Sequence, residues 1–263
     1  MKNDAMKNAP AGENERPLML APAFKDYIWG GERLKRDWGK QTDLSPLAES
    51  WELSCHKDGP STIVNGPDAG RTLAEYAARH PACVGTRHTD GVFPVLIKLI
   101  DAARPLSVQV HPDDAYAQRV EGEPGKTEMW YVVDAQPGAQ LYYGFQRELT
   151  REEAARRIAD GTLTDVLNAV PVKAGDVFFI DAGTVHAIGA GILIAEIQQN
   201  LIVFRGLQSQ GLQQNFSVFI VLQSDIVVGF FYLSGVVGDG IFADFVVNVI
   251  GLGIHFTVFQ NVG

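Results

Sequence analysis

Several features that mark particular classes of protein are missing from this chain of 263 residues. It holds only two cysteines, Cys55 and Cys83, too few for a disulfide framework, which points to a reducing compartment. No charge-free apolar run is long enough to cross a bilayer, and the polar residues 1–17 lack the apolar stretch of a signal peptide. We therefore expect a soluble cytoplasmic protein that does not act at a membrane.

Positive charge is also scarce. The chain has 22 basic and 31 acidic residues, which gives a net charge of −9, and no block of like charge interrupts it. A nucleic-acid-binding surface usually shows as a cluster of lysine and arginine. The sequence therefore predicts no nucleic-acid partner.

The last 63 residues have the fewest charges of all. Residues 201–263 hold four charged residues, against 49 in the first 200, and they contain no Lys, Glu, Pro, Trp, Cys or Met. Val, Ile and Phe fill 27 of these 63 positions. An outer sheet this apolar would expose a large hydrophobic face unless an oligomer buried it. Two explanations stay open: an extensive subunit interface, or residue identities that differ from those of the natural protein.

The middle of the chain has the pattern of a β-protein. Apolar runs predict strands at 93–100, 106–111, 128–133, 176–180 and 191–198, and further strands in the tail. Capping boxes predict short helices at 73–79 and 151–159, and a further helical segment is expected at 163–169. Because strands dominate and no alternating strand–helix pattern appears, we expect an antiparallel barrel or sandwich.

Polar side chains recur at alternate positions near two of these strands. Ser107, Gln109 and His111 stand two residues apart, so on a strand all three would point to one face. Lys126 and Glu128 have the same spacing and would also share a face. Each residue alone is more often a surface or hydrogen-bonded group, but their combination favours a common site.

A further histidine follows a tight turn at the end of a predicted strand. It stands in the pattern Gly175-x5-Asp181-x-Gly183-x2-His186. Two oxygen and two imidazole ligands suit a zinc-class divalent ion that keeps positions open for water or substrate. The predicted ligands are Gln109, His111, Glu128 and His186.

The pattern around His186 resembles the second motif of the cupin superfamily, with Asp181 where proline is usual. The stretches 96–114, 125–145 and 172–200 resemble type I mannose-6-phosphate isomerases in their short bacterial form, and so do 25–34 and 48–56. Ser-x-Gln-x-His at 107–111, in place of the usual His-x-His, separates this family from oxygenase-type cupins. The resemblance implies a mainly β fold: a cupin barrel of jelly-roll type, a few helices and a second, degenerate cupin-like region at the C-terminus.

The resemblance also implies roles for individual residues. The four predicted ligands correspond to those of one zinc ion per chain, and Ser107 and Lys126 match residues that hold the sugar phosphate. Arg205 lies about one residue short of the expected spacing, so it is either the counterpart of an arginine thought to be catalytic or an unrelated residue. Trp29, Glu49 and Trp51 resemble residues that line the sugar pocket. The implied reaction is the interconversion of D-mannose 6-phosphate and D-fructose 6-phosphate.

Some questions stay open at this level. The base that moves the carbon-bound proton is either Glu196, which would share a strand face with Gln198, or a metal-bound hydroxide. A non-enzymatic cupin that binds zinc and sugar is an alternative, and an iron-dependent oxygenase would want histidine at position 109.

We expect a disordered leader at 1–17, a catalytic cupin domain at 18–200 with a helical insertion near 150–169, and a C-terminal β-region at 201–263. The partner is a phosphorylated hexose, and the protein is either a monomer or a homodimer.

Overall fold

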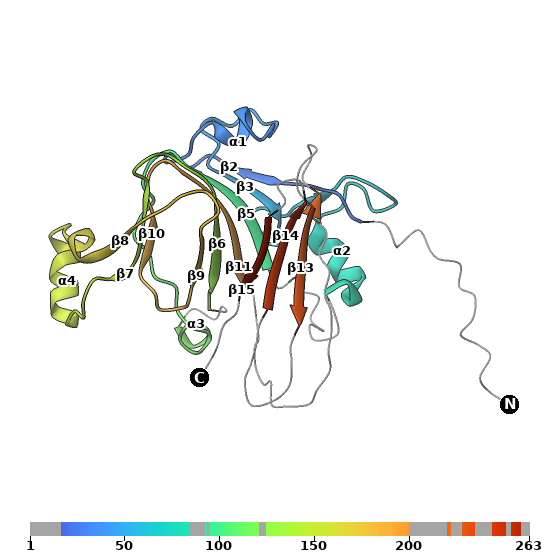
Figure 1. Cartoon of the computed structure of the whole chain (residues 1–263). Helices are drawn as coiled ribbons and strands as arrows, with labels where there is room; N and C mark the ends of the chain where they lie inside the picture. The colour runs from blue at the N-terminus through green and yellow to red at the C-terminus, as the bar shows by residue number, and fades with distance from the viewer. Residues whose placement is uncertain are drawn as a thin grey trace. The chain divides into compact units, whose positions relative to one another are not determined.

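A computed structural model describes residues 17–84, 93, 95–120 and 125–199, together with the backbone of four strands in the tail. The chain divides into two compact units. The larger one consists of Pro22–Ser61 and Leu73–Gln210, and it contains every residue of the candidate site that the structure describes. Figure 1 shows the elements of the chain by label.

Two antiparallel sheets build the larger unit. The first has six strands in the order β2-β3-β5-β11-β6-β9, and the second has three in the order β10-β7-β8. The bounds of the six are β2 (Ala23–Lys25), β3 (Glu49–Leu53), β5 (Val95–Ala102), β11 (Ile192–Gln199), β6 (Glu128–Ala135) and β9 (Val177–Ile180). Those of the three are β10 (His186–Ile188), β7 (Gln140–Phe145) and β8 (Leu167–Pro171). Every pair of neighbouring strands is antiparallel.

The core lies between these two sheets, because apolar side chains from both pack into one cluster. The six-stranded sheet contributes alternate residues of its central strands, and the three-stranded sheet contributes Leu141 and Ile188. Period-two alternation puts such residues on the inner face and leaves their neighbours for the outer one. The cluster consists of Ile100, Ala102, Trp130, Val132, Ala139, Leu141, Ile180, Ile188, Ile192 and Ile194. The predicted mainly β cupin fold is confirmed.

Short helices connect the strands of the larger unit. They are α1 (Arg33–Arg36), α2 (Leu73–Arg79), the 3-10 helix η2 (Pro81–Val84), α3 (Asp114–Val120), α4 (Arg151–Ala159) and the 3-10 helix η3 (Leu163–Val166). The Thr150 side chain accepts a hydrogen bond from the Glu153 N–H, so the predicted N-cap is confirmed, while the Glu153 carboxylate binds Arg147 and Arg157. Within the described residues no helix is long and apolar enough to cross a membrane.

Two local predictions differ from the structure. Residues 106–111 do not form a strand: the segment is extended, and its one β-bridge joins Gln109 to His186. The Leu106 N–H also donates to the carbonyl oxygen of Ile188, so four residues of the segment lie against the three of β10 and the ladder is irregular. The helical segment predicted for 163–169 ends after one 3-10 turn, and β8 follows because it pairs with β7. In both cases pairing with a distant strand decides the local conformation.

The smaller unit contains two further sheets. β1 (Leu20–Ala21) pairs with β4 (Thr62–Ile63), and the tail strands form an antiparallel sheet in chain order. The tail strands are β12 (Ile220–Val221), β13 (Val228–Ser234), β14 (Asp244–Ile250) and β15 (Ile254–Val258). The tail therefore contains the strands that its apolar runs predict.

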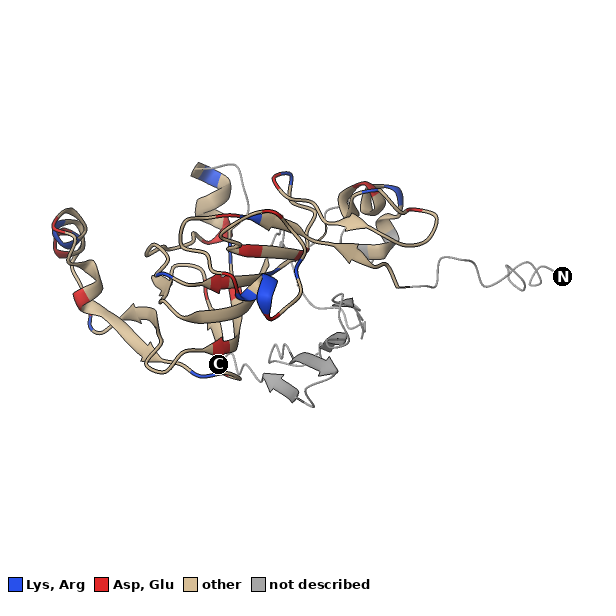
Figure 2. Ribbon diagram, turned by 90° about the horizontal axis from the view of Figure 1, so that it is seen from above, with Lys and Arg blue, Asp and Glu red and all other residues tan. Residues whose placement is uncertain are grey.

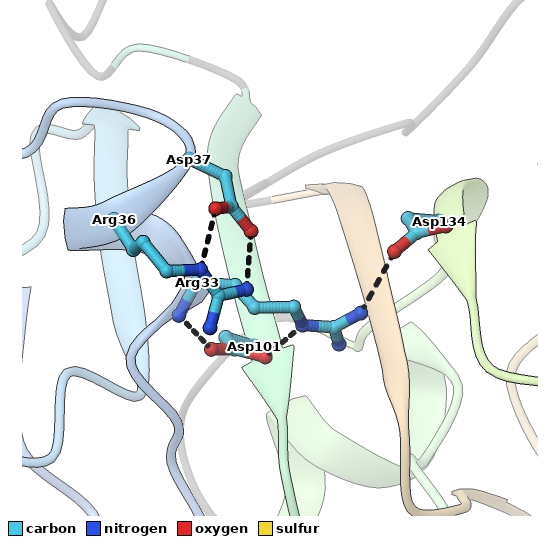
Figure 3. Close-up of polar contacts among 5 residues, drawn as sticks. All are labelled: Arg33, Arg36, Asp37, Asp101 and Asp134. Carbon is cyan, nitrogen blue, oxygen red and sulfur yellow. Dashed lines mark hydrogen bonds and ion pairs between the residues drawn. The ribbon is translucent and has the colours of Figure 1, made fainter.

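Charged residues occur within the strands of the larger unit as well as on its helices (Figure 2). One such cluster lies on the outer face of the six-stranded sheet (Figure 3). The Arg33 side chain donates to the buried carboxylate of Asp101 at 2.7 Å, its backbone N–H donates to the other oxygen at 2.8 Å, and it also reaches Asp134 at 3.1 Å. This cluster ties the start of α1 to β5 and β6.

Candidate metal centre and active site

His186 begins β10 directly after a tight turn. Gly183 in that turn has a φ of +85°, a left-handed conformation that glycine adopts without steric cost. The Gly183 N–H donates to the carbonyl oxygen of His111 at 2.7 Å, and the Thr184 N–H donates to that of Asp181 at 3.0 Å. The turn therefore forms with aspartate where proline is usual, and it holds the start of β10 beside His111.

Three side chains from three segments converge at this point. His111 ends the extended segment, Glu128 begins β6 and His186 begins β10, and one possible ligand atom of each lies within 4.8 Å of the others. The Nε2 atom of His111 lies 3.2 Å from Oε1 of Glu128, and Nε2 of His186 lies 3.8 Å from Oε2. Glu128 and His186 are buried and His111 is half-buried. These residues could hold a metal ion.

A hydrogen bond fixes the orientation of His186. Its Nδ1–H donates to the carbonyl oxygen of Thr184 at 2.8 Å, which leaves the Nε2 lone pair free. Burial lowers the pKa of His186 and so favours the neutral ring. A neutral imidazole with a bare Nε2 is the form that binds a metal ion.

The ligand atoms have few partners besides one another. Nε2 of His111, Oε1 of Glu128 and Nε2 of His186 are buried and make no hydrogen bond of good geometry to the described residues, although Oε1 of Glu128 forms ion pairs with His111 and Lys126. Buried polar atoms nearly always have a hydrogen-bond partner, so Nε2 of His186 above all indicates an occupant that the chain does not supply. Two imidazole nitrogens and a carboxylate oxygen are ligands that zinc and similar divalent ions accept. The residues present fit a metal ion.

The backbone places Gln109 beside His186. The two residues exchange both hydrogen bonds of an antiparallel bridge, each at 2.9 Å. Side chains directly opposite one another in such a pair point to the same face. The half-buried Gln109 side chain therefore lies next to the His186 ring, where an amide oxygen could complete the ligand set.

Lys126 lies against the same carboxylate. The Lys126 ammonium group forms an ion pair with Oε1 of Glu128, and the backbone N–H of Lys126 donates to the carbonyl oxygen of Pro112 at 3.1 Å. A Cβ on the preceding Gly125 would come within 2.5 Å of the Asp113 carbonyl carbon, so only glycine permits this approach. Burial raises the pKa of Glu128, but His111 and Lys126 outweigh it, and the net shift is downward. Glu128 is therefore held as a carboxylate.

Glu196 lies one strand away from Glu128. The indole N–H of Trp130 donates to Oε2 of Glu128 at 2.9 Å and to Oε2 of Glu196 at 3.2 Å. On the other side, Nζ of Lys98 forms an ion pair with Oε1 of Glu196 at 2.9 Å. Burial lowers the pKa of Lys98, but Glu196 and Glu49 outweigh this and raise it, so the lysine keeps its charge. Lys98, Glu196 and Trp130 thus form a connected set of polar contacts on the inner face of the sheet, which reaches the metal-ligand candidate Glu128. We call these three residues the polar row.

The residues expected to line the sugar pocket fall in two places. Glu49 and Trp51 are buried on β3, where the indole N–H donates to Oε2 of Glu49 at 2.5 Å. Nζ of Lys98 lies 5.3 Å from the Trp51 ring, so both residues adjoin the polar row. Trp29 packs against the hydrophobic core and stacks on Tyr27 at 5.5 Å.

Comparison with known proteins agrees with this geometry. The model of the catalytic domain of type I phosphomannose isomerases matches residues 18–135. Mannose-6-phosphate isomerases of Streptococcus mutans and Bacillus subtilis (ManA) are 45% and 44% identical, each over 70% of this chain. A crystal structure of the Bacillus subtilis mannose 6-phosphate isomerase superposes with a TM-score of 0.66 at 30% identity, covering 88% of this chain and 80% of that one. The chain belongs to the type I phosphomannose isomerase family.

The match to this isomerase family is not complete in length. The chain covers 58% of the length of the two curated relatives. The family model covers residues 18–135, which include His111 and Glu128 but not His186. Arg205, the predicted catalytic arginine, lies outside the described residues, so its role stays a prediction. Ser107 is exposed on the extended segment.

Two members of the polar row were not predicted from the sequence. Lys98 interrupts the apolar run Phe93–Ile100, and a charge inside a buried strand indicates a buried partner. Trp130 stands two residues after Glu128 and would share its strand face. Both signals are visible in the sequence, but neither reveals that the two residues meet at Glu196.

Proposed function

We propose that this protein interconverts D-mannose 6-phosphate and D-fructose 6-phosphate at the site around Glu128. The observation that carries the proposal is the convergence of three possible ligand atoms, from His111, Glu128 and His186, beside a lysine that can bind phosphate. Membership of the family and the names of its relatives support the same reaction.

The metal would be held by Gln109, His111, Glu128 and His186, and we propose one zinc ion per chain. Nitrogen and oxygen donors in this ratio suit zinc better than magnesium or calcium, which prefer oxygen alone. When bound, the ion would stabilise negative charge on the sugar oxygens during isomerisation.

The phosphate would be bound by Lys126 with help from Ser107. Lys126 lies two residues before the first residue of β6, and its side chain is 25% exposed, so its ammonium group can contact a ligand that enters from solvent. An ammonium group and a hydroxyl donor suit a dianion inside an otherwise acidic protein. The phosphate would thus orient the sugar with its reactive end toward the polar row.

Glu196 would move the proton between C1 and C2. Its carboxylate is 4% exposed, the Trp130 indole holds it in place, and Lys98 stabilises its charged form. A carboxylate fixed in this way can take a proton from one carbon and return it to the next. Arg205 is proposed as a second cation beside the intermediate. A cytoplasmic location and a monomeric or homodimeric state stay predictions, as do the domain boundaries.

A coupled isomerase assay tests the proposal. Zinc-loaded protein should convert mannose 6-phosphate, protein treated with a chelator should not, and added zinc should restore the activity. His111→Ala should abolish both zinc content and turnover, whereas His80→Ala, on a surface loop after α2, should change neither. Zinc-loaded protein that binds sugar phosphate without converting it would indicate the non-enzymatic cupin instead.

A further inference from the structure

Gln198 lies where β11 meets the start of β6. It stands directly opposite Glu128 on β6 and opposite Leu96 on β5. Residues opposite one another in an antiparallel pair have Cβ atoms about 5 Å apart and point to the same face. Glu196, two residues earlier on the strand, shares that face. The Gln198 side chain therefore lies on the inner face of the sheet, on the same side as that of Glu128.

The amide oxygen of Gln198 lacks a hydrogen-bond partner among the described residues. The side chain is only 9% exposed, and its Oε1 atom is buried without a hydrogen-bond partner in the part of the chain that the structure describes. An unpaired buried carbonyl destabilises a fold, so it persists where a ligand supplies the missing donor. Gln198 is the one amide side chain among the buried polar atoms that lack a partner in the described residues.

We propose that Gln198 binds a hydroxyl group of the hexose and so helps to select the substrate. The inference rests on the proposed function of the site. An amide oxygen accepts from a hydroxyl group, and it offers no attraction to a phosphate dianion. Gln198 therefore addresses the hydroxyl-bearing part of the sugar, whereas Lys126 addresses its phosphate. A residue of this kind determines specificity, because a sugar that lacks the hydroxyl leaves the buried carbonyl unpaired.

Gln198→Met is the informative substitution, since methionine keeps the length of the side chain and removes the amide. Gln199→Met is the matched control, because Gln199 is the next residue of β11 and points to the opposite face. Binding is measured by calorimetric titration with 1,5-anhydromannitol 6-phosphate, which cannot open and isomerise. We expect Gln198→Met to weaken this binding by about 2- to 10-fold, as the loss of one neutral hydrogen bond predicts, and Gln199→Met to leave it unchanged.

Two further readouts separate substrate binding from other roles. If the amide contacts only the sugar, Gln198→Met keeps its zinc content and unfolds at or above the temperature of the wild type, because an unpaired buried acceptor has been removed. Loss of zinc would make Gln198 a metal ligand, and a lower unfolding temperature would make it structural. Either result would overturn the proposal.

Derivatives of the same probe that lack the hydroxyl at C2, C3 or C4 identify the partner. For the derivative that lacks the contacted hydroxyl, the wild type should lose as much affinity as the parent probe loses on Gln198→Met. Gln198→Met itself should bind this derivative and the parent probe equally well. Equal losses on both proteins for all three derivatives would refute the contact. These titrations need no turnover, so failure of the isomerase assay would refute the proposed function and leave this inference to be decided by binding.

Discussion

Lys126→Met provides the sharpest test of whether one residue of the site binds the phosphate group and others bind the rest of the sugar. The substitution keeps the aliphatic stem and removes the ammonium group that pairs with Glu128. That group is 25% exposed, so solvent screens it only in part, and a charge-assisted hydrogen bond to phosphate is worth about 1.5–3 kcal/mol. Since about 1.4 kcal/mol corresponds to a tenfold change, mannose 6-phosphate should bind about 10- to 100-fold more weakly.

The assay compares two sugars on the same variant. Binding of unphosphorylated mannose should change far less than binding of mannose 6-phosphate, because mannose has no group that meets the ammonium ion. Lys173→Met is the matched control. Lys173 is 84% exposed, and its ammonium group forms an ion pair with Asp176 at 2.9 Å, outside the candidate site. It should bind both sugars as the wild type does.

Zinc content has to be measured alongside, because Lys126 also helps to keep Glu128 ionised. Its removal takes away one of the cations that lower the pKa of that carboxyl group, so the pKa rises and metal binding weakens first at acidic pH. The comparison is therefore made near neutral pH. Equal losses for both sugars, or unchanged binding of mannose 6-phosphate, would refute a phosphate-binding role for Lys126.

The remaining predictions concern the metal, the fold and the tail. His186→Ala should lose the metal outright, whereas Gln109→Ala should weaken it less, because an amide oxygen is the poorer ligand; metal analysis after dialysis distinguishes them. Asp101→Ala should cost about 3 kcal/mol of unfolding free energy in urea titrations, because the largely buried guanidinium of Arg33 then keeps only the exposed Asp134 as an ionic partner, while the exposed Arg36→Ala should leave the midpoint unchanged. Peptide mass mapping of residues 201–263 should return masses that differ from the printed sequence; matching masses would instead favour a large subunit interface, visible as a dimer by light scattering.

The sequence alone was sufficient for the local features of this protein. The N-cap residue Thr150 places the N-terminus of α4, and apolar runs place β5, β6, β9 and β11 to within a few residues. These features depend on neighbours a few positions away, and such interactions are fixed by local geometry. The resemblance to type I mannose-6-phosphate isomerases is confirmed, and the residue types offered as metal ligands were also chosen from sequence, through their spacing.

Tertiary structure decided everything that depends on distant partners. The segment from Leu106 to His111 is not a strand, because its backbone bonds to Ile188 and His186 set four of its residues against three of β10. The convergence of His111, Glu128 and His186 joins residues up to 75 positions apart. Likewise the ion pair of Lys98 with Glu196 depends on which strands lie side by side.

The physical reason is that periodicity fixes the face of a strand and leaves its neighbour undetermined. Alternation places Glu196 and Gln198 on one face of β11, and this could be read from the sequence. It does not reveal that Glu128 lies opposite Gln198, since that register is set by the packing of the whole sheet. The sequence determined which chemical groups this protein has, and only the tertiary structure decided which of them meet.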